Sequence, residues 1–357
     1  MAKKIYFNHD RQPSLFDQPE PTPPKDSAPL TDLFGEAPVS IQPPSPQRQP
    51  EPLAIPTTPL QTITPEQPMG PVVVKPVPNK FSFISFGSGS SGNCSYIGDS
   101  RSGFLIDAGV DPVHVVDTLK QHGVSMEAVK AVIITHDHSD HMRYVYNLLR
   151  KYRLQLFCTA RALNGILRRH NVSRRIKDYQ QNIYKEIPFT IGNFTITPFE
   201  VLHDGTDNVG FHIAHDERAI TVATDLGCIS ARADYYMRQC DYLVIEANYD
   251  LNMLRHGAYP EYLKARIRSD HGHMDNNDTA EYIAQIHTPR LTHVFLCHLS
   301  QDNNTPDLAL TAVSTALERR GLKVGHALDT PADLAADIQL MTLPRFNASR
   351  MFHFRQK

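Results

Sequence analysis

Apolar and polar positions along the chain predict short strands and amphipathic helices only from residue 81 onward. The β-rich runs are Phe81–Phe86, Cys94–Ile97, Gly103–Asp107, Ala131–Thr135, Phe194–Pro198, Gly210–Ile213, Ala219–Ala223, Tyr242–Ile245 and Val294–Leu296. Helical spacing of apolar residues marks Val113–Gln121, Met142–Tyr152, Ala160–His170, Asn277–Ile286 and Asp307–Arg320. Strands dominate the first section and then alternate with helices, which predicts an α/β sandwich rather than an all-β fold.

Proline separates the first 80 residues from the rest of the chain, because they contain 19 of the 27 prolines. Proline removes a backbone donor and restricts the residue before it. Apolar residues are also too sparse there to offset the entropy lost on ordering. We therefore expect residues 1–80 to form a disordered, partly polyproline-II arm and residues 81–357 to form one α/β domain.

Composition narrows the class of protein and its compartment. The 357 residues are 41% hydrophobic, which is enough for a core. No run approaches the roughly 18 apolar residues of a membrane span. The N-terminal residues lack the apolar stretch of a secretory signal, and the five cysteines show no paired spacing. We therefore expect a cytoplasmic protein with reduced thiols and no membrane partner.

A glycine-rich loop after the first predicted strand, Gly87–Gly92, matches the dinucleotide pattern G-x-G-x-x-G. A dinucleotide site needs a helix directly after these glycines, whose N-terminus receives the pyrophosphate. Here a second strand follows, so we expect a tight hairpin and no NAD site. Alternatively, the amides and hydroxyls of the loop cradle an anion. This alternative makes Ser90, Ser91 and Asn93 candidate substrate-binding residues.

The pattern H-x-H-x-D-H, at His136–His141, carries the strongest chemical signal and follows an apolar strand. In a loop that leaves a strand, His136 and His138 can chelate one ion. Asp140 and His141 lie further round the loop and can take a second ion. Imidazole and carboxylate ligands without a thiolate suit Zn²⁺ or Mn²⁺.

Two ions need more ligands than this loop supplies, and three candidates end apolar runs downstream. They are His203, Asp225 and His298. Any one of them, taken alone, is more typical of an ordinary loop residue. Together with the histidine pattern they predict a dinuclear site, because α/β folds place functional side chains where strands end.

The complete set of motifs resembles the metallo-β-lactamase fold over essentially all of residues 81–357. Asp107 fits the first motif of that superfamily, and the histidine pattern fits the second. The resemblance implies a four-layer αββα sandwich with two divalent metal ions. It further implies that His136, His138 and His203 hold one ion, that Asp140, His141 and His298 hold the other, and that Asp225 bridges the two.

Further segments resemble the YycJ (WalJ) branch of that superfamily. They are Ser88–Asn93, Glu246–Asn248, Gly272–His273, His298–Ser300 and Asn303–Pro306. This resemblance implies a 5′→3′ exonuclease of double-stranded DNA linked to mismatch repair, and it makes Asn304 a candidate substrate-binding residue. The Pro-rich arm is not part of the pattern of that branch.

Hydrolysis of a phosphodiester needs an activated water and an acid for the leaving alkoxide. Two ions supply the activated water and clamp the phosphate oxygens, which makes Asp140 a catalytic residue as well as a ligand. Glu246 and His273 are the candidate acid, like the Glu/His pair of the similar tRNA 3′-processing endonuclease. The alternative is that Glu246 caps a helix and His273 is an ordinary loop histidine.

Positive charge is concentrated in residues 143–177, which contain ten Lys or Arg and no Asp or Glu. A solvated helix face is the simpler explanation, but such faces normally mix both signs of charge. Beside a dinuclear centre, the stretch is typical of a track for a phosphate backbone. The candidate substrate-binding residues in it are Arg168, Arg169, Arg174 and Arg175.

The arm contains a short pattern, Q-x-x-L-F, that resembles bacterial sliding-clamp-binding peptides. Its residues are Gln12, Leu15 and Phe16. A Leu-Phe pair on a disordered arm supplies apolar anchors for a groove, and the glutamine supplies a hydrogen bond. Chance matches to so short a pattern are common, so the clamp is a candidate partner only.

These observations predict a dinuclear metal-dependent phosphodiesterase, specifically a 5′→3′ DNA exonuclease in DNA repair. Alternatives on the same fold are a nuclease that processes RNA and a hydrolase of a small phosphodiester or thioester. The basic stretch argues against the thioester. A non-catalytic DNA or clamp adaptor is the alternative outside enzymes. The large ligand set argues against it, because a structural metal site is closed and needs fewer ligands.

Overall fold

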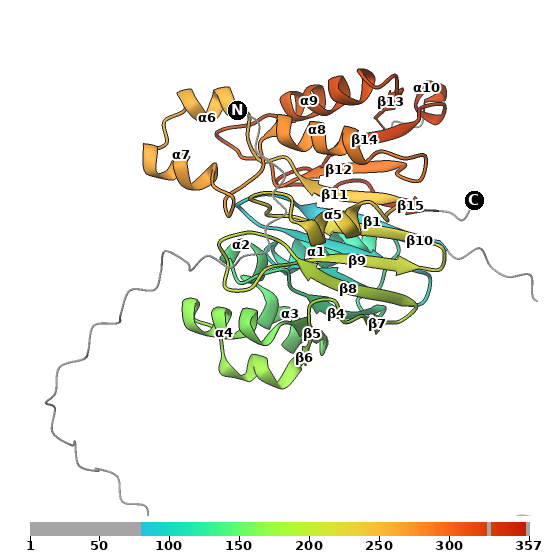
Figure 1. Cartoon of the computed structure of the whole chain (residues 1–357). Coiled ribbons are helices and arrows are strands. Elements are labelled where there is room, and N and C mark those ends of the chain that lie inside the picture. Colours follow the sequence, from blue (N-terminus) through green and yellow to red (C-terminus); the bar gives the residue numbers. More distant parts are fainter. Residues whose placement is uncertain (1–79, 327–329, 355–357) are drawn as a thin grey trace, which may run out of the picture. The chain divides into compact units, whose positions relative to one another are not determined.

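The computed structural model describes residues 80–326 and 330–354, and Figure 1 shows how their helices and strands are arranged. The arm predicted over residues 1–80, with its clamp-binding peptide, lies outside these ranges except for Lys80, and both stay predictions. No helix in the described ranges has the length and apolar character needed to cross a bilayer.

The first of two mixed sheets contains seven strands of the described chain. In spatial order they are β15 (Phe352–Phe354), β1 (Phe81–Gly87), β2 (Cys94–Gly98), β3 (Gly103–Ile106), β4 (Val129–Ile133), β5 (Gln155–Cys158) and β6 (Gln180–Asn182). Pairing is antiparallel from β15 to β3 and parallel from β3 to β6. Because β1 and β2 pair antiparallel across the glycine loop, the predicted hairpin is confirmed.

The second sheet contains eight strands of the described chain. In spatial order they are β13 (Val324–Gly325), β14 (Ile338–Thr342), β12 (His293–Cys297), β11 (Tyr242–Glu246), β10 (Arg218–Ala223), β9 (Val209–His215), β8 (Phe194–Glu200) and β7 (Phe189–Ile191). Pairing is antiparallel from β7 to β10 and parallel from β10 to β13. Each sheet therefore has an antiparallel half and a parallel half.

The two sheets pack face to face through an apolar layer that includes Phe83, Phe104, Phe211 and Phe295. The helices on the first sheet are α1 (Pro112–Gln121), α2 (Ser139–Met142), α3 (Val145–Tyr152), α4 (Ala160–Arg169) and the 3₁₀ helix η1 (Arg174–Tyr179). Those on the second sheet are α5 (Ala231–Met237), α8 (Asn276–Ile286) and α9 (Pro306–Glu318). The fold is thus the four-layer αββα sandwich that the sequence resemblance implied (Figure 1).

Three shorter helices complete the described elements. α6 (Leu251–His256) and α7 (Glu261–Ile267) share a small apolar cluster of their own, and α10 (Pro331–Leu334) precedes β14. Figure 1 shows α6 and α7 together, in light orange.

Two differences between the predicted elements and the structure affect the candidate site. The strand predicted over Ala131–Thr135 begins at Val129 and ends at Ile133, which leaves Thr135 outside the ladder and able to donate to Asp107. The helix predicted over Met142–Tyr152 is divided at Arg143 and Tyr144 into α2 and α3. α2 begins at Ser139, so Asp140 and His141 lie in a first helical turn rather than in an extended loop.

Candidate metal centre

All seven predicted metal ligands lie where strands end, and their loops meet at one edge of the sandwich. β4 leads to His136, His138, Asp140 and His141, β8 to His203, β10 to Asp225 and β12 to His298. β8 and β10 run in the same direction because both are antiparallel to β9, and β11 and β12 run parallel to β10. The carboxyl ends of these strands therefore lie at the same edge, and the predicted side chains are brought together.

The ligand atoms form two groups that share Asp225. One group is His136, His138, His203 and Asp225, and the other is Asp140, His141, Asp225 and His298. In each group the candidate ligand atoms lie within 4.8 Å of one another. Asp225 Oδ2 lies 3.5 Å from His136 Nε2 and 3.2 Å from His141 Nε2, and Asp225 Oδ1 lies 3.3 Å from His298 Nδ1. Asp225 thus occupies the position that the resemblance gives to a bridging ligand.

Hydrogen bonds from neighbouring residues fix the orientation of the imidazole rings. His141 Nδ1 lies 2.7 Å from Asp107 Oδ2. Asp107 in turn accepts hydrogen bonds from the amide and the hydroxyl of Thr135. His203 Nδ1 donates to the carbonyl oxygen of Gly272 at 2.9 Å. Such outer partners set the tautomer of a ligating histidine and direct its second nitrogen at the metal.

Two buried imidazole nitrogens show that the residues present fit a metal ion. The Nε2 atoms of His136 and His298 have no hydrogen-bond partner among the described residues, which is costly for a buried polar atom. Burial, together with nearby His141, holds the pKa of His136 well below its usual value. Its ring is therefore neutral, which is the form that ligates metal.

The carboxylates of the centre also favour a bound cation. Burial opposes ionisation of Asp225, but His298 and His141 hold its pKa well below the usual range. Burial likewise disfavours a charged His298, yet Asp225, Asp140 and Glu246 raise its pKa to about 10. The carboxylates around His298 therefore attract positive charge to this part of the centre. A donor set of imidazoles and carboxylates without a thiolate fits divalent ions such as Zn²⁺ or Mn²⁺.

Glu246 and His273, the candidate acid pair, are joined by a hydrogen bond beside the second ligand group. His273 Nδ1 lies 2.7 Å from Glu246 Oε1, and His298 Nδ1 lies 2.9 Å from the same oxygen. Burial opposes the charge of Glu246, but His273 and His298 lower its pKa to about 2, so the carboxylate accepts both hydrogen bonds. Glu246 does not cap a helix, because the nearby helix α8 is capped by Asp275.

The three candidate residues of the glycine loop differ in what they contact. Ser90 and Ser91 are exposed, as a substrate contact requires. Asn93 is buried, and its Nδ2 atom donates to Asp140 Oδ2 at 3.1 Å and lies 2.9 Å from His141 Nε2. Asn93 therefore positions two of the metal ligands. This position corrects the expectation that it contacts substrate.

Asn304 is also a structural residue, which corrects its assignment to substrate binding. Its side chain is buried and donates to the carbonyl of Asn248 at 3.1 Å and to Asn276 Oδ1 at 2.9 Å. These bonds fix the loop that carries His298. Ser88, in the glycine loop, supports the same ligand by accepting a hydrogen bond from the backbone amide of His298.

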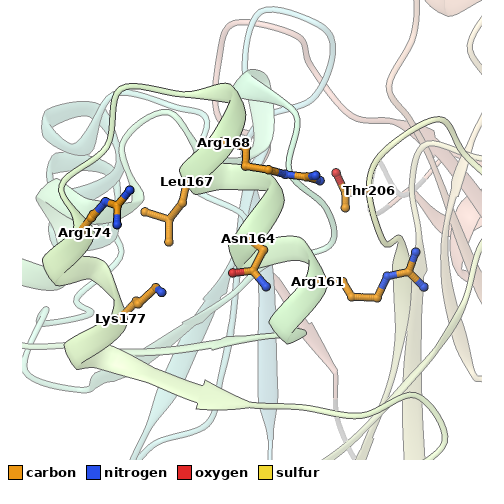
Figure 2. Close-up of a pocket in the computed structure, with 7 residues that line it drawn as sticks. All are labelled: Arg161, Asn164, Leu167, Arg168, Arg174, Lys177 and Thr206. Carbon is orange, nitrogen blue, oxygen red and sulfur yellow. The ribbon is translucent and has the colours of Figure 1, made fainter. Parts of the chain in front are cut away.

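The four arginines predicted to bind phosphate separate into two pairs. Arg168 and Arg174 line a pocket of about 580 Å³ between α4 and η1 (Figure 2). Arg169 Nη1 instead lies 3.5 Å from Asp137 Oδ2, and Arg175 forms an exposed ion pair with the aspartate three residues further on. The acid-free stretch therefore contributes two of the four arginines to one concave surface.

Two further aspartates of the site are not predicted from the sequence. Asp137 is buried inside the histidine pattern and accepts hydrogen bonds from the amide and the hydroxyl of Thr206. Asp204 Oδ1 lies 3.4 Å from His138 Nε2, and its other oxygen accepts from Arg266 Nε. Each aspartate is next to a predicted ligand in the sequence, and this position is the only hint of its role. The hydrogen-bond donors, Thr206 and Arg266, are 69 and 62 residues away in the sequence.

Comparisons with known proteins agree with this centre. A family model described as a beta-lactamase superfamily domain matches residues 103–298. Exodeoxyribonuclease YycJ of Bacillus anthracis is 33% identical over 261 residues, covering 72% of this chain and 98% of that protein. Exodeoxyribonuclease WalJ of Streptococcus pneumoniae is 32% identical over 262 residues, covering 72% and 97%. The metallo-beta-lactamase fold protein YhfI from Bacillus subtilis has the same fold, with a TM-score of 0.55 and 14% identity over 77% of this chain and 100% of that one.

The fold and its clustered histidines and aspartates define a metal-dependent hydrolase. The range matched by the family model contains all seven predicted ligands. The chain belongs to the β-lactamase superfamily and, within it, to the family of the YycJ and WalJ proteins.

Proposed function

We propose that this chain is a dinuclear phosphodiesterase, and specifically a 5′→3′ exonuclease of double-stranded DNA that acts in DNA repair. The observation that carries the proposal is the pair of ligand groups that share Asp225. The relatives, which the chain matches over nearly their whole length, are named exodeoxyribonucleases. Two ions side by side suit an in-line displacement at phosphorus, where the attacking and leaving oxygens both need charge stabilisation.

Separate groups of residues in the chain would hold the two ions. His136, His138 and His203 would hold one ion, and Asp140, His141 and His298 the other, with Asp225 between them. Divalent ions held there supply Lewis acidity toward phosphate oxygens and make water a stronger nucleophile. The buried hydrogen bonds around the rings hold this arrangement before substrate arrives.

His273 is the residue that we assign to proton transfer. Its Nδ1 atom donates to the ionised Glu246, so its Nε2 atom is the one that can give a proton to the leaving alkoxide. The ring lies 5.0 Å from that of His203 and 5.3 Å from that of His298, centroid to centroid, which places it over the centre. Its side chain keeps 20% of its surface exposed, as a group that meets substrate must.

A nuclease that processes RNA is the second candidate, because the sequence shows no base-reading motif that would separate DNA from RNA. A hydrolase of a small ester is less well supported, since the pocket that contains Arg168 and Arg174 suits a polyanion. A non-catalytic adaptor fits poorly with a centre that has seven ligands and a hydrogen-bonded acid pair.

The proposal is tested by turnover of 5′-labelled duplex DNA, single-stranded DNA and matched RNA with Mn²⁺ or Zn²⁺. Asp140→Ala removes one ligand of the second ion and should lower turnover by about a thousandfold or more. Asp117→Ala, an exposed aspartate on α1, is the matched control. Release of nucleotides from the duplex 5′ end, lost in Asp140→Ala alone, is the expected result. Turnover of a small ester without any nucleic-acid cleavage would overturn the nuclease assignment.

A further inference from the structure

The pocket between α4 and η1 is lined by positively charged side chains from two neighbouring elements (Figure 2). Arg161, Arg168 and Asn164 come from α4, and Arg174 and Lys177 come from η1. The pocket has a volume of about 580 Å³, which is enough for more than one phosphate group. It is separate from the seven metal ligands, none of which lines it.

Helical geometry explains why these residues share one surface. In α4 the lining positions are spaced by three and four residues, so they lie on one face, while Ala162 and Ile166 are buried on the other. In a 3₁₀ helix, residues three apart are aligned, which places Arg174 above Lys177. The same rule aligns Arg175 with the aspartate that it pairs with, on a different side of η1.

The charge of this pocket is not neutralised by the fold. No Asp or Glu lines it. Across the described residues, Arg161, Arg168, Arg174 and Lys177 form no ion pair, whereas their neighbours Arg169 and Arg175 do. Cations held together without counter-charges repel one another, and an anion in the pocket relieves that repulsion.

The remaining lining residue connects the pocket to the metal centre. Thr206 is three residues beyond His203 and donates through its hydroxyl to Asp137, which lies between two metal ligands in sequence. At about 3.6 Å per extended residue, Thr206 lies within roughly 11 Å of His203 along the backbone. The pocket therefore adjoins the loop that carries a candidate metal ligand, so one nucleic-acid strand can reach both the pocket and the centre.

We propose that this pocket binds backbone phosphates of the nucleic-acid strand, away from the bond cleaved at the metal centre. The inference rests on the proposed nuclease function and adds a second, non-reacting contact to it. Leu167 is the one apolar lining residue, and no aromatic ring lines the pocket. The site therefore recognises phosphate and not bases, and it holds strands of any sequence.

The test compares binding of the full chain and its variants to a fluorescent single-stranded DNA of about 20 nucleotides. EDTA is added so that cleavage does not interfere. Arg168→Ala with Arg174→Ala should weaken binding about tenfold or more per removed cation. The salt dependence of log Kd should lose about one unit of slope per contact.

Arg175→Ala separates a pocket from a diffuse positive field, because Arg175 lies in the same 3₁₀ helix but faces away. Arg319→Ala, at the C-cap of α9, combined with Arg175→Ala controls for the loss of two positive charges. We expect the pocket variant to lose far more affinity than either comparison, and to raise KM for long strands far more than for bis(p-nitrophenyl) phosphate. Equal losses in Arg168→Ala/Arg174→Ala and Arg175→Ala, or no loss in the pocket variant, overturn the proposal.

Two further measurements keep the result interpretable. Lys177→Ala, at another exposed lining position, should weaken binding in the same direction, and unchanged binding in this variant would contradict the pocket. If the unmodified chain binds DNA in EDTA but cleaves no nucleic acid with metal, the nuclease proposal fails. The comparison of variants still decides whether the pocket binds the strand.

Discussion

Three residues at the metal centre hold their backbones in the left-handed region. Asp107, Asp225 and His298 have φ angles of 61°, 50° and 53°, and they make up half of the six non-glycine residues with positive φ in the described ranges. Each such residue costs about 1–3 kcal/mol and persists only because its surroundings enforce the conformation. Asp107 and His298 directly follow β3 and β12, and Asp225 follows β10 after one intervening residue. The turn redirects the side chain from the sheet toward the centre.

Asp107 is the clearest positioning residue, since it contacts the ligand His141 and not the ion groups themselves. Asp107→Asn keeps the volume but removes the charge that orients the ring. We expect metal affinity to fall by about 10–100-fold, measured by competition with a chromophoric chelator. Asp99→Asn is the matched control, because Asp99 pairs with His215 at 3.4 Å away from the centre. Equal metal affinity in Asp107→Asn and the unmodified chain would contradict this role.

At the residue scale, the sequence predicts the candidate ligands and points to Asp107, but it does not predict that Asn93 and Asn304 support them. The spacing of His136 and His138 along one loop predicts that they chelate one ion. Asn93 gives no such signal, because the ligands that it contacts are 47 and 48 residues away and meet it only through packing. The sequence also does not show which side chains are exposed. It therefore favours Asn93 and Asn304 as substrate contacts, although both are buried.

At the scale of elements, the loop after β3 and the short helix α2 approach so closely that only glycine fits between them. A Cβ atom at Gly109 would lie 1.6 Å from the carbonyl oxygen of Asp140. The amide of Gly109 also donates to the carbonyl oxygen of Asn93, which joins the same loop to the glycine hairpin. Three segments that carry or support ligands thus depend on one missing side chain.

Gly109→Ala should therefore separate these segments. We expect the free energy of unfolding to fall by about 2–3 kcal/mol and the metal affinity to fall with it, measured by urea unfolding and chelator competition. Gly123→Ala is the control, because its φ is +75° but no atom lies within 4 Å. That variant should lose only about 1 kcal/mol from backbone strain and keep its metal affinity. An intact metal affinity in Gly109→Ala would show that the loops are not coupled.

Elements with a clear apolar pattern are predictable from the sequence. Strands that form only because a neighbouring strand pairs with them are not. The sequence predicts both ends of β8 to β12 to within two residues, because these strands are rich in buried apolar residues. β6 reads Gln180–Asn182 and is a strand only because it pairs with β5. β15 pairs with β1 across more than 270 residues, as Phe81 opposite Phe354 shows. Such long-range pairing leaves no local pattern.

At the scale of the whole molecule, two histidines of the second sheet connect stability to pH. Burial, followed by Arg290, lowers the pKa of His212 to about 4. Burial, followed by Arg218 and Arg350, lowers that of His293 to about 4. In the unfolded chain both titrate near 6.5. As the pH falls from about 6.5 to about 4, the unfolded chain binds protons that the folded chain does not, so stability is lost in this window.

Replacing both residues, as His212→Gln with His293→Gln, should make the fall in unfolding free energy between pH ~7 and ~5 shallower. Urea unfolding at the two pH values measures the difference. His122→Gln, at an exposed turn after α1, is the control substitution. The same slope in the double variant as in the unmodified chain would show that these histidines do not contribute.

The division of the ligands between the two sheets has a consequence for the order of assembly. Each ligand group takes two side chains from the loop after β4 and two from the loops of the second sheet. Neither half of the sandwich, made separately, would therefore supply all four candidate ligands of a group. We therefore expect metal binding to follow the packing of the two sheets. Metal held there would fasten the two halves at that edge, so metal content would report completed folding as well as catalytic competence.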